Sequence, residues 1–168
     1  MNIFTVGYEG TNIDEVLDVL KGHNIDTLLD VRLTPLSRKS GFSKTALSSY
    51  LFGNGIAYIH VKSLGCPNSI RNPYKEDGNW GLYTSRYKKF LETRIEDVMD
   101  ITSIALTTNC CLLCFERNAN FCHRSFIADR MVEVSNGLLE RIDLLPQLTS
   151  STQKFVKTTP LFPGLVRP

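Results

Sequence analysis

Short apolar runs recur along the chain and predict the strands of a sheet. Each run is only a few residues long and is followed by a more polar stretch. The fourth run, "CCLLCFE", shows no alternation of polar and apolar positions, which is typical of a strand buried on both faces. The predicted strands cover residues 2–8, 25–31, 56–61, 110–116 and 141–145.

Between these runs, apolar residues three or four positions apart predict helices. Residues 12–23 place Val16, Leu17 and Leu20 on one face, with Asn12 as a suitable N-cap and Gly22 as a suitable end. The stretch "SLGCPNSIRNPYKEDGNWG" is rich in Gly, Pro and Asn and predicts a long irregular loop. The other predicted helices cover residues 43–55, 83–99 and 123–137.

Strands that alternate with helices predict an α/β fold. We expect a single three-layer domain with a mostly parallel sheet of four to five strands and helices on both faces. A chain of 168 residues is the size of one domain. We expect the domain to cover residues 1–145 and residues 146–168 to form a weakly ordered tail, whose "TTPLFPGLV" either packs back on the domain or docks a protein partner.

Composition narrows the class of protein without identifying a function. Hydrophobic residues make up 42% and charged residues 21% of the chain, and the net charge is +2, too small by itself to indicate nucleic acid or a membrane as partner. The chain shows no apolar run long enough for a membrane span and no signal-peptide pattern, so we expect a cytoplasmic protein. Five cysteines then predict free thiols rather than disulfides.

Polar residues follow the predicted strands and should meet at one edge of the sheet. In parallel sheets, ligands bind beyond the carboxyl ends of the strands. Asp30 and Arg32 follow the second strand, His60 ends the third, and Glu116 follows the fourth. We therefore expect these side chains to converge.

Two segments near that edge suit anion binding. The loop "DVRLTPLSRKSGFSK" gathers Arg32, Ser37 and Arg38 before a predicted helix, an arrangement that suits a phosphate. A solvated loop in which Asp30 pairs with Arg32 explains it equally well. Cations alternate with aromatics around Arg71 and Tyr83, which suits base stacking and phosphate contact, or else fastens the loop to the domain.

The segment "CFERNANFCHR" concentrates reactive side chains. If a helix begins near Cys122, its N-terminus and Arg124 favour the thiolate, and Glu116 could act as general base or orient His123. A buried structural cysteine explains Cys122 as well. Metal binding is a third option: Cys111 and Cys114 point to opposite faces of a strand and cannot share one ion, which leaves Cys66, Cys122 and His123 as a smaller cluster.

Five ordered motifs give the chain a family resemblance. "TVGYEG", "LLDVRLTPLSRKSGFSK", "GIAYIHVKSLG", "LLCFE" and "CHRSFIADRM" together resemble the uncharacterised family domain of unknown function 488, which includes the YeaO-like proteins, over about residues 3–135. The resemblance implies a small α/β domain and no settled activity or cofactor. It also raises the weight of matching residues such as Asp30, Arg32, Tyr58 and Arg71.

The leading hypothesis is an enzyme that acts on a phosphate-bearing ligand, a nucleotide or nucleic acid, at the carboxyl edge of the sheet. The alternatives are a non-catalytic nucleic-acid-binding module and a thiol or metal sensor. We expect Glu116 and Cys122 to carry the chemistry with Asp30. The expected anion ligands are Arg32, Ser37, Arg38, Arg71, His123 and Arg124, and the expected stacking residues are Tyr58 and Tyr83.

Overall fold

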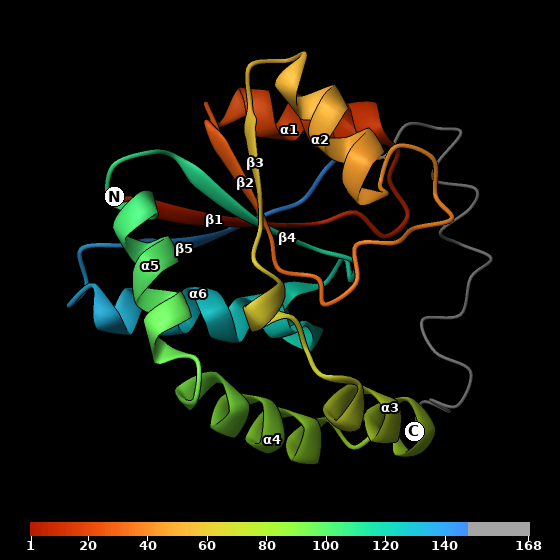
Figure 1. Cartoon of the computed structure of the whole chain (residues 1–168), viewed down its shortest axis with the longest axis vertical. Helices are drawn as coiled ribbons and strands as arrows, with labels where there is room; N and C mark the ends of the chain where they lie inside the picture. The colour runs from red at the N-terminus through yellow and green to blue at the C-terminus, as the bar shows by residue number, and fades with distance from the viewer. Residues whose placement is uncertain (148–168) are drawn as a thin grey trace.

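The computed structural model describes residues 1–147 and consists of an α/β domain built on one sheet (Figure 1). The strand order is β3-β2-β4-β1-β5, and each pair of neighbours is parallel. The predicted fold class is therefore confirmed, with five strands. The strands are β1 (Asn2–Gly7), β2 (Thr27–Asp30), β3 (Ala57–His60), β4 (Cys110–Cys114) and β5 (Glu140–Leu144).

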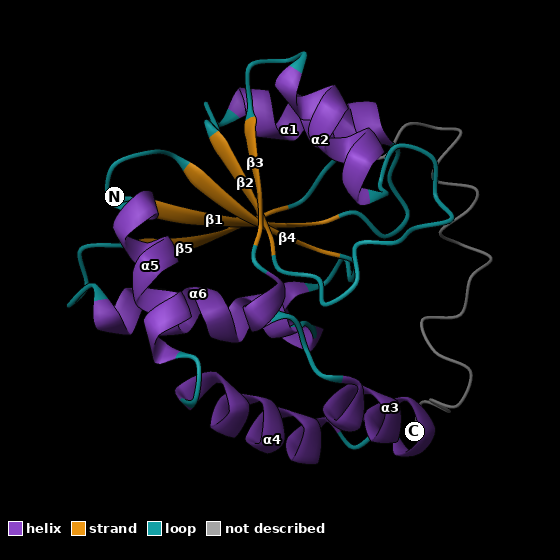
Figure 2. Cartoon of the chain, viewed as in Figure 1, coloured by secondary structure: helices purple, strands orange, loops and turns teal. Residues whose placement is uncertain are grey.

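Helices cover both faces of this sheet, which gives three layers (Figures 1 and 2). One face carries α1 (Ile13–Gly22) and α2 (Lys44–Phe52). The other carries α4 (Trp80–Glu92), α5 (Ile95–Ala105) and α6 (His123–Val134). A sixth helix, α3 (Asn68–Asp77), packs against α4.

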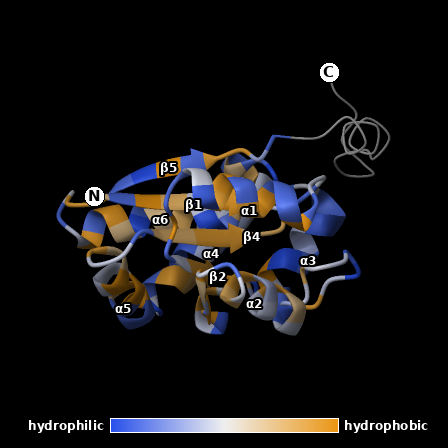
Figure 3. Ribbon diagram, turned by 90° about the horizontal axis from the view of Figure 1, so that it is seen from above, coloured by the Kyte–Doolittle hydropathy of each residue, from blue (hydrophilic) through white to orange (hydrophobic). Residues whose placement is uncertain are grey.

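The central strand β4 is buried along its whole length, as its unbroken apolar pattern predicts, and it is apolar in Figure 3. Cys111 and Leu113 belong to the core under α1 and α2, whereas Cys110 and Leu112 belong to the core under α4, α5 and α6. Because successive side chains of a strand point to opposite faces, Cys114 points to the α6 side. This parity brings a thiol at the carboxyl end of β4 close to the start of α6.

The first helix begins and ends where its sequence predicts. The Asn12 side chain accepts a hydrogen bond from the Glu15 backbone N–H, and the Glu15 carboxylate accepts one from the Asn12 backbone N–H, so the two residues form a capping box. The helix then ends at Gly22. These local contacts fix the entry of α1 onto the sheet independently of the site.

Two predictions for the middle of the chain are wrong. The stretch expected to be an irregular loop holds a short 3₁₀ helix (Lys62–Leu64), then α3, which contains Pro73 and ends at Gly78 with a φ of 65°. The single helix expected at residues 83–99 is two helices, because the chain turns at Thr93 and Arg94 between α4 and α5. Proline and asparagine have low helix propensity, so α3 was not predicted. The apolar face continues through the turn between α4 and α5, so the break was not predicted either.

The described residues stop just inside the predicted tail. The Pro146 carbonyl accepts a hydrogen bond from Arg117 Nη2 at 2.9 Å, which ties the end of the described chain to the loop after β4. The rest of the tail, with the predicted docking peptide, lies outside the described residues. No helix within residues 1–147 is both long enough and apolar enough to cross a membrane.

Candidate metal centre

The connection from β4 to α6 passes directly over the end of β1, and Gly7 makes this possible. A Cβ atom at residue 7 would lie 1.8 Å from the Glu116 carbonyl oxygen. The backbone N–H of Glu9 donates to the Phe115 carbonyl at 2.8 Å, and that of Arg117 donates to the Glu9 carboxylate at 3.0 Å. These contacts hold Glu116 against the carboxyl edge of the sheet.

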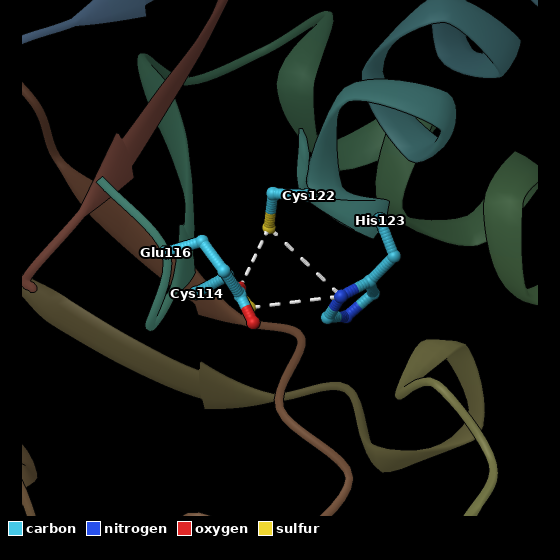
Figure 4. Close-up of side chains that lie close together, drawn as sticks. All are labelled: Cys114, Glu116, Cys122 and His123. Carbon is cyan, nitrogen blue, oxygen red and sulfur yellow. Dashed lines mark hydrogen bonds between the residues drawn. The ribbon is translucent and has the colours of Figure 1, made fainter. Parts of the chain in front are cut away.

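Four polar side chains meet at this edge: Cys114, Glu116, Cys122 and His123 (Figure 4). Both Sγ atoms lie 3.0 Å from Oε2 of Glu116. Nδ1 of His123 lies 3.6 Å from the Sγ of Cys114 and 3.9 Å from the Sγ of Cys122. One donor atom from each of the four residues falls within 4.8 Å of the other three. The strand end, the loop and the helix start thus contribute to one compact cluster.

The backbone fixes the orientation of the histidine ring. Nε2 of His123 lies 2.9 Å from the carbonyl oxygen of Val31, just after β2. A carbonyl can only accept, so Nε2 carries a hydrogen and the neutral ring presents the lone pair of Nδ1 to the two sulfur atoms. A histidine that ligates a metal is commonly held by a hydrogen bond of this kind.

The four side chains of the cluster shift one another's pKa values. Burial and the neighbouring Cys122 raise the pKa of Glu116 to about 7, and burial raises the pKa of Cys114 well above its ordinary value. Burial also opposes ionisation of Cys122, but contacts with Cys114, His123 and Arg124 lower its pKa well below the ordinary value. Burial acts to lower the pKa of His123, but the contacts of His123 with Cys122 and Glu116 raise it above the ordinary value.

Arg124 supports the loop that carries Glu116. Its side chain is fully buried, and its guanidinium donates to the Glu116 carbonyl, to the Arg117 carbonyl at 3.1 Å and to Thr5 Oγ1 at 3.1 Å. These donors are used inside the protein. The role of Arg124 as an anion ligand stays a prediction.

Asp30 and Arg32 form a second buried cluster at the same edge. Arg32 donates from Nη2 to Asp30 Oδ2 at 2.5 Å and from Nη1 to the hydroxyl of Tyr8 at 2.9 Å. Tyr58 donates to Asp30 Oδ2 at 2.6 Å, and its pKa is raised by burial and by this contact. The alternative interpretation of this loop expected Asp30 to pair with Arg32. The two residues do pair, but both side chains are buried rather than solvated. Within residues 1–147, no hydrogen bond joins these side chains to the thiols.

The loop after Arg32 spreads its polar residues over the surface. Arg38 is exposed, and Ser37 Oγ accepts a hydrogen bond from the backbone N–H of Lys39. Lys39 Nζ donates to the Tyr8 carbonyl at 3.1 Å. Ser37 and Arg38 are therefore not brought to the thiol cluster, and a phosphate at this loop stays a prediction.

Tyr83 and Cys66 lie in the core under α4, α5 and α6, and Arg71 is a partly buried residue of α3. Tyr83 is buried, and Trp80 stacks on Phe126 of α6 with ring centroids 5.8 Å apart, so these aromatics fasten α4 to the domain. Burial raises the pKa of Cys66 to about 11, while the hydrogen bond with Tyr83 and the charge of Arg71 act to lower it. Cys66 neighbours the cluster without belonging to it.

Sequence reasoning missed Cys114 as a member of the site. Cys111 and Cys114 cannot share one ion, since the two side chains face opposite sides of β4. The same parity, applied to Cys114 alone, puts it on the side of Cys122. The spacing Cys114-x-Glu116 followed by Cys122-His123 was the available signal.

The fold and this cluster define an α/β domain with a buried thiol, carboxylate and imidazole group at the carboxyl edge of a parallel sheet. The chain belongs to the family described as domain of unknown function DUF488, whose model matches residues 12–131. The family resemblance of the motifs is thereby confirmed. Searches of curated proteins and of solved structures gave no match to the chain.

Proposed function

We propose that this protein is a zinc-binding domain in which Cys114, Glu116, Cys122 and His123 hold one ion. The observation that carries the proposal is the separation of the donor atoms. Tetrahedral Zn²⁺ with Zn–S of about 2.3 Å and Zn–N of about 2.0 Å requires sulfur and nitrogen about 3.5 Å apart. The distances from Nδ1 to the two Sγ atoms are 3.6 and 3.9 Å. Oε2 of Glu116 lies 3.0 Å from each Sγ, at hydrogen-bond distance, and would move away from the sulfur atoms when the ion binds.

The charges support the same proposal. Two thiols and a carboxyl group buried side by side are unfavourable as anions unless a cation neutralises them. Thiolate, imidazole and carboxylate together suit Zn²⁺, whereas Mg²⁺ and Ca²⁺ prefer oxygen ligands alone. The Val31 carbonyl that orients His123 supplies the outer contact that such a ligand needs.

A zinc titration in competition with a chromogenic chelator tests the proposal. Reduced, metal-free protein should take up one equivalent. Cys114→Ala and Cys122→Ala should each weaken binding by about 100-fold or more, since even residues that only orient a ligand contribute about 10–100-fold. The matched control is Cys111→Ala, which removes a thiol from the same strand on its opposite face. No stoichiometric uptake, or equal loss in all three variants, would sink the proposal.

Thiol catalysis on a phosphate-bearing ligand is the second candidate. It is favoured by the position of Cys122 at the N-terminus of α6, where the helix dipole stabilises a thiolate. The side chain of Cys122 is only 1% exposed, which favours the metal instead. The rate of Cys122 alkylation distinguishes them: zinc should protect a ligand, and a nucleophile should react equally fast with and without chelator.

A further inference from the structure

The two sulfur atoms of the metal centre share one hydrogen-bond acceptor. The thiols of Cys114 and Cys122 each donate to Oε2 of Glu116 at 3.0 Å, and the two Sγ atoms lie within 4.8 Å of each other (Figure 4). In a disulfide the sulfur atoms lie about 2.05 Å apart. A change of rotamer about the Cα–Cβ bond moves a sulfur atom by about 3 Å. The separation of the two sulfurs is thus within the range that side-chain rotation can close.

The other three cysteines are placed apart from this pair. Cys111 points to the opposite face of β4, into the core under α1 and α2. Cys110 begins β4 at its amino end, away from the carboxyl edge of the sheet. Cys66 is not among the four residues that meet at the cluster. Cys114 and Cys122 are therefore the cysteine pair that the fold brings together.

The burial of the pair restricts the oxidants that can reach it. The side chains of Cys114 and Cys122 are only 3% and 1% exposed. Glu116, which contacts both sulfurs, is itself partly exposed, and Phe115 beside it is exposed. Hydrogen peroxide is little larger than water, whereas glutathione disulfide must bring a bulky sulfur into line with the attacking thiol. The site thus favours a peroxide over a bulky disulfide as oxidant.

We propose that Cys114 and Cys122 are a peroxide-sensitive pair that forms a reversible disulfide and releases the metal ion as it does so. The release rests on the proposed zinc function, because a disulfide has lost both thiolate ligands. The centre then binds zinc under reducing conditions and gives it up under oxidising ones. A small thiol such as dithiothreitol restores the pair.

The oxidation proceeds in two balanced steps. The Cys122 sulfur, at the N-terminus of α6, bonds to one oxygen of hydrogen peroxide as the O–O bond breaks, which gives a sulfenic acid and water. The Cys114 sulfur then attacks the Cys122 sulfur, so that the S–S bond forms, the S–O bond breaks and a second water leaves. The sulfurs lose two electrons, which reduce the peroxide. Each thiol proton passes through the Glu116 carboxylate to the departing oxygen. In the zinc-bound protein the sulfurs are thiolates, and water supplies both protons.

Peptide mapping by mass spectrometry tests the inference. Trypsin cleaves after lysine and arginine, so Cys122 lies alone in peptide 118–124, Cys114 lies in 95–117 with Cys110 and Cys111, and Cys66 lies in 63–71. The zinc-loaded full chain would be treated with hydrogen peroxide or, separately, with glutathione disulfide, and then alkylated under denaturing conditions. A chromogenic chelator reports the released zinc.

With hydrogen peroxide we expect a linkage between peptides 118–124 and 95–117 that grows in parallel with zinc release and that dithiothreitol reverses. Glutathione disulfide should react more slowly by about tenfold or more. Cys114→Ala should lose the linkage, whereas the matched control Cys111→Ala should keep it. Because Cys114→Ala also weakens zinc binding, both variants are compared without metal, where the linkage alone is measured.

The outcomes separate the two proposals. Zinc binding with no linkage, or with sulfinic acid in place of the disulfide, overturns the inference and leaves the metal centre intact. A linkage to peptide 63–71, or one that only Cys111→Ala removes, also overturns it, because a different pair then forms. Equally fast linkage by glutathione disulfide overturns the assignment to a peroxide. Failure of the reduced chain to bind zinc overturns the proposed function, and this inference with it.

Discussion

Nε2 of His123 lies 2.9 Å from the carbonyl oxygen of Val31, and this contact joins the end of β2 to the start of α6. It forces the other ring nitrogen to face Cys114 and Cys122. The tautomer of the histidine is thus set by the packing of a helix onto a sheet, with a backbone atom as partner. A ligand held in this way is preorganised before any ion arrives.

Zinc should stabilise the folded domain. An ion that binds only the native state at 100 times its dissociation constant adds about 2.7 kcal/mol. For a chain of this size that corresponds to a rise in Tm of about 5–10 °C. Differential scanning fluorimetry of reduced protein with zinc and with chelator measures it. The Cys114→Ala, Cys122→Ala double variant should show no difference, and an unchanged Tm in the wild type would count against the metal centre.

Gly7→Ala should displace the loop that carries Glu116, although Gly7 is not itself a member of the cluster. The added methyl group would collide with the Glu116 carbonyl, so the loop must shift. We expect a loss of about 1–3 kcal/mol in the free energy of unfolding, as for other overpacked positions, together with weaker zinc binding. Gly22→Ala is the control: nothing lies within 4 Å of its Cβ position, and alanine in a helix should be neutral or stabilising by up to about 1 kcal/mol. Similar urea midpoints for both variants would contradict this account.

Arg124→Met should lower the free energy of unfolding of the domain, rather than affect ligand binding alone. The substitution leaves the carbonyls of Glu116 and Arg117 without a donor, at about 1–3 kcal/mol each. Chemical denaturation compares it with Arg86→Met, an exposed control. Wild-type stability in Arg124→Met would contradict the structural role and favour the anion-binding role predicted from the sequence.

Asp143 should make stability depend on acid. Burial acts to raise its pKa, but hydrogen bonds from Arg141 and Thr5 lower it below the ordinary value. The stabilisation is therefore present above the pKa of the unfolded chain, about 3.9, and is lost as the pH falls through the lower pKa of the folded state. Wild type should exceed Asp143→Asn in unfolding free energy near pH 6. The difference should shrink as the pH falls toward 3 and the Asp143 carboxylate becomes protonated. A difference that is constant with pH would refute the assignment.

The sequence predicted most of the fold because its signals were local. The cap at Asn12 and the unbroken apolar run of β4 each predict an element from a few neighbouring residues. Pro73 and the asparagines around it argue against a helix on propensity alone, so α3 escaped detection. Its side chains are not fully buried, and it is held by packing against α4 that no local pattern reveals.

Three of the four members of the proposed metal centre were candidate site residues from the sequence, since Glu116, Cys122 and His123 stand together after a strand. They were expected in other roles, Glu116 and Cys122 in catalysis and His123 in anion binding. Cys114 was not predicted, because in the sequence it is part of an apolar run. Its role depends on which face of β4 it occupies and on how closely the loop returns over Gly7. Arg124 was assigned to the ligand because an arginine near a thiol suggests an anion, whereas its burial and its carbonyl partners are tertiary facts.

X-ray absorption at the zinc edge tests the central claim most directly, because it reports the atoms bound to the ion. For protein loaded with one equivalent of zinc, we predict two sulfur ligands at about 2.3 Å and two nitrogen or oxygen ligands at about 2.0–2.1 Å. Cys114→Ala should lose one sulfur, and Cys111→Ala should lose none. A first shell of nitrogen and oxygen alone in the wild type would contradict the proposed centre.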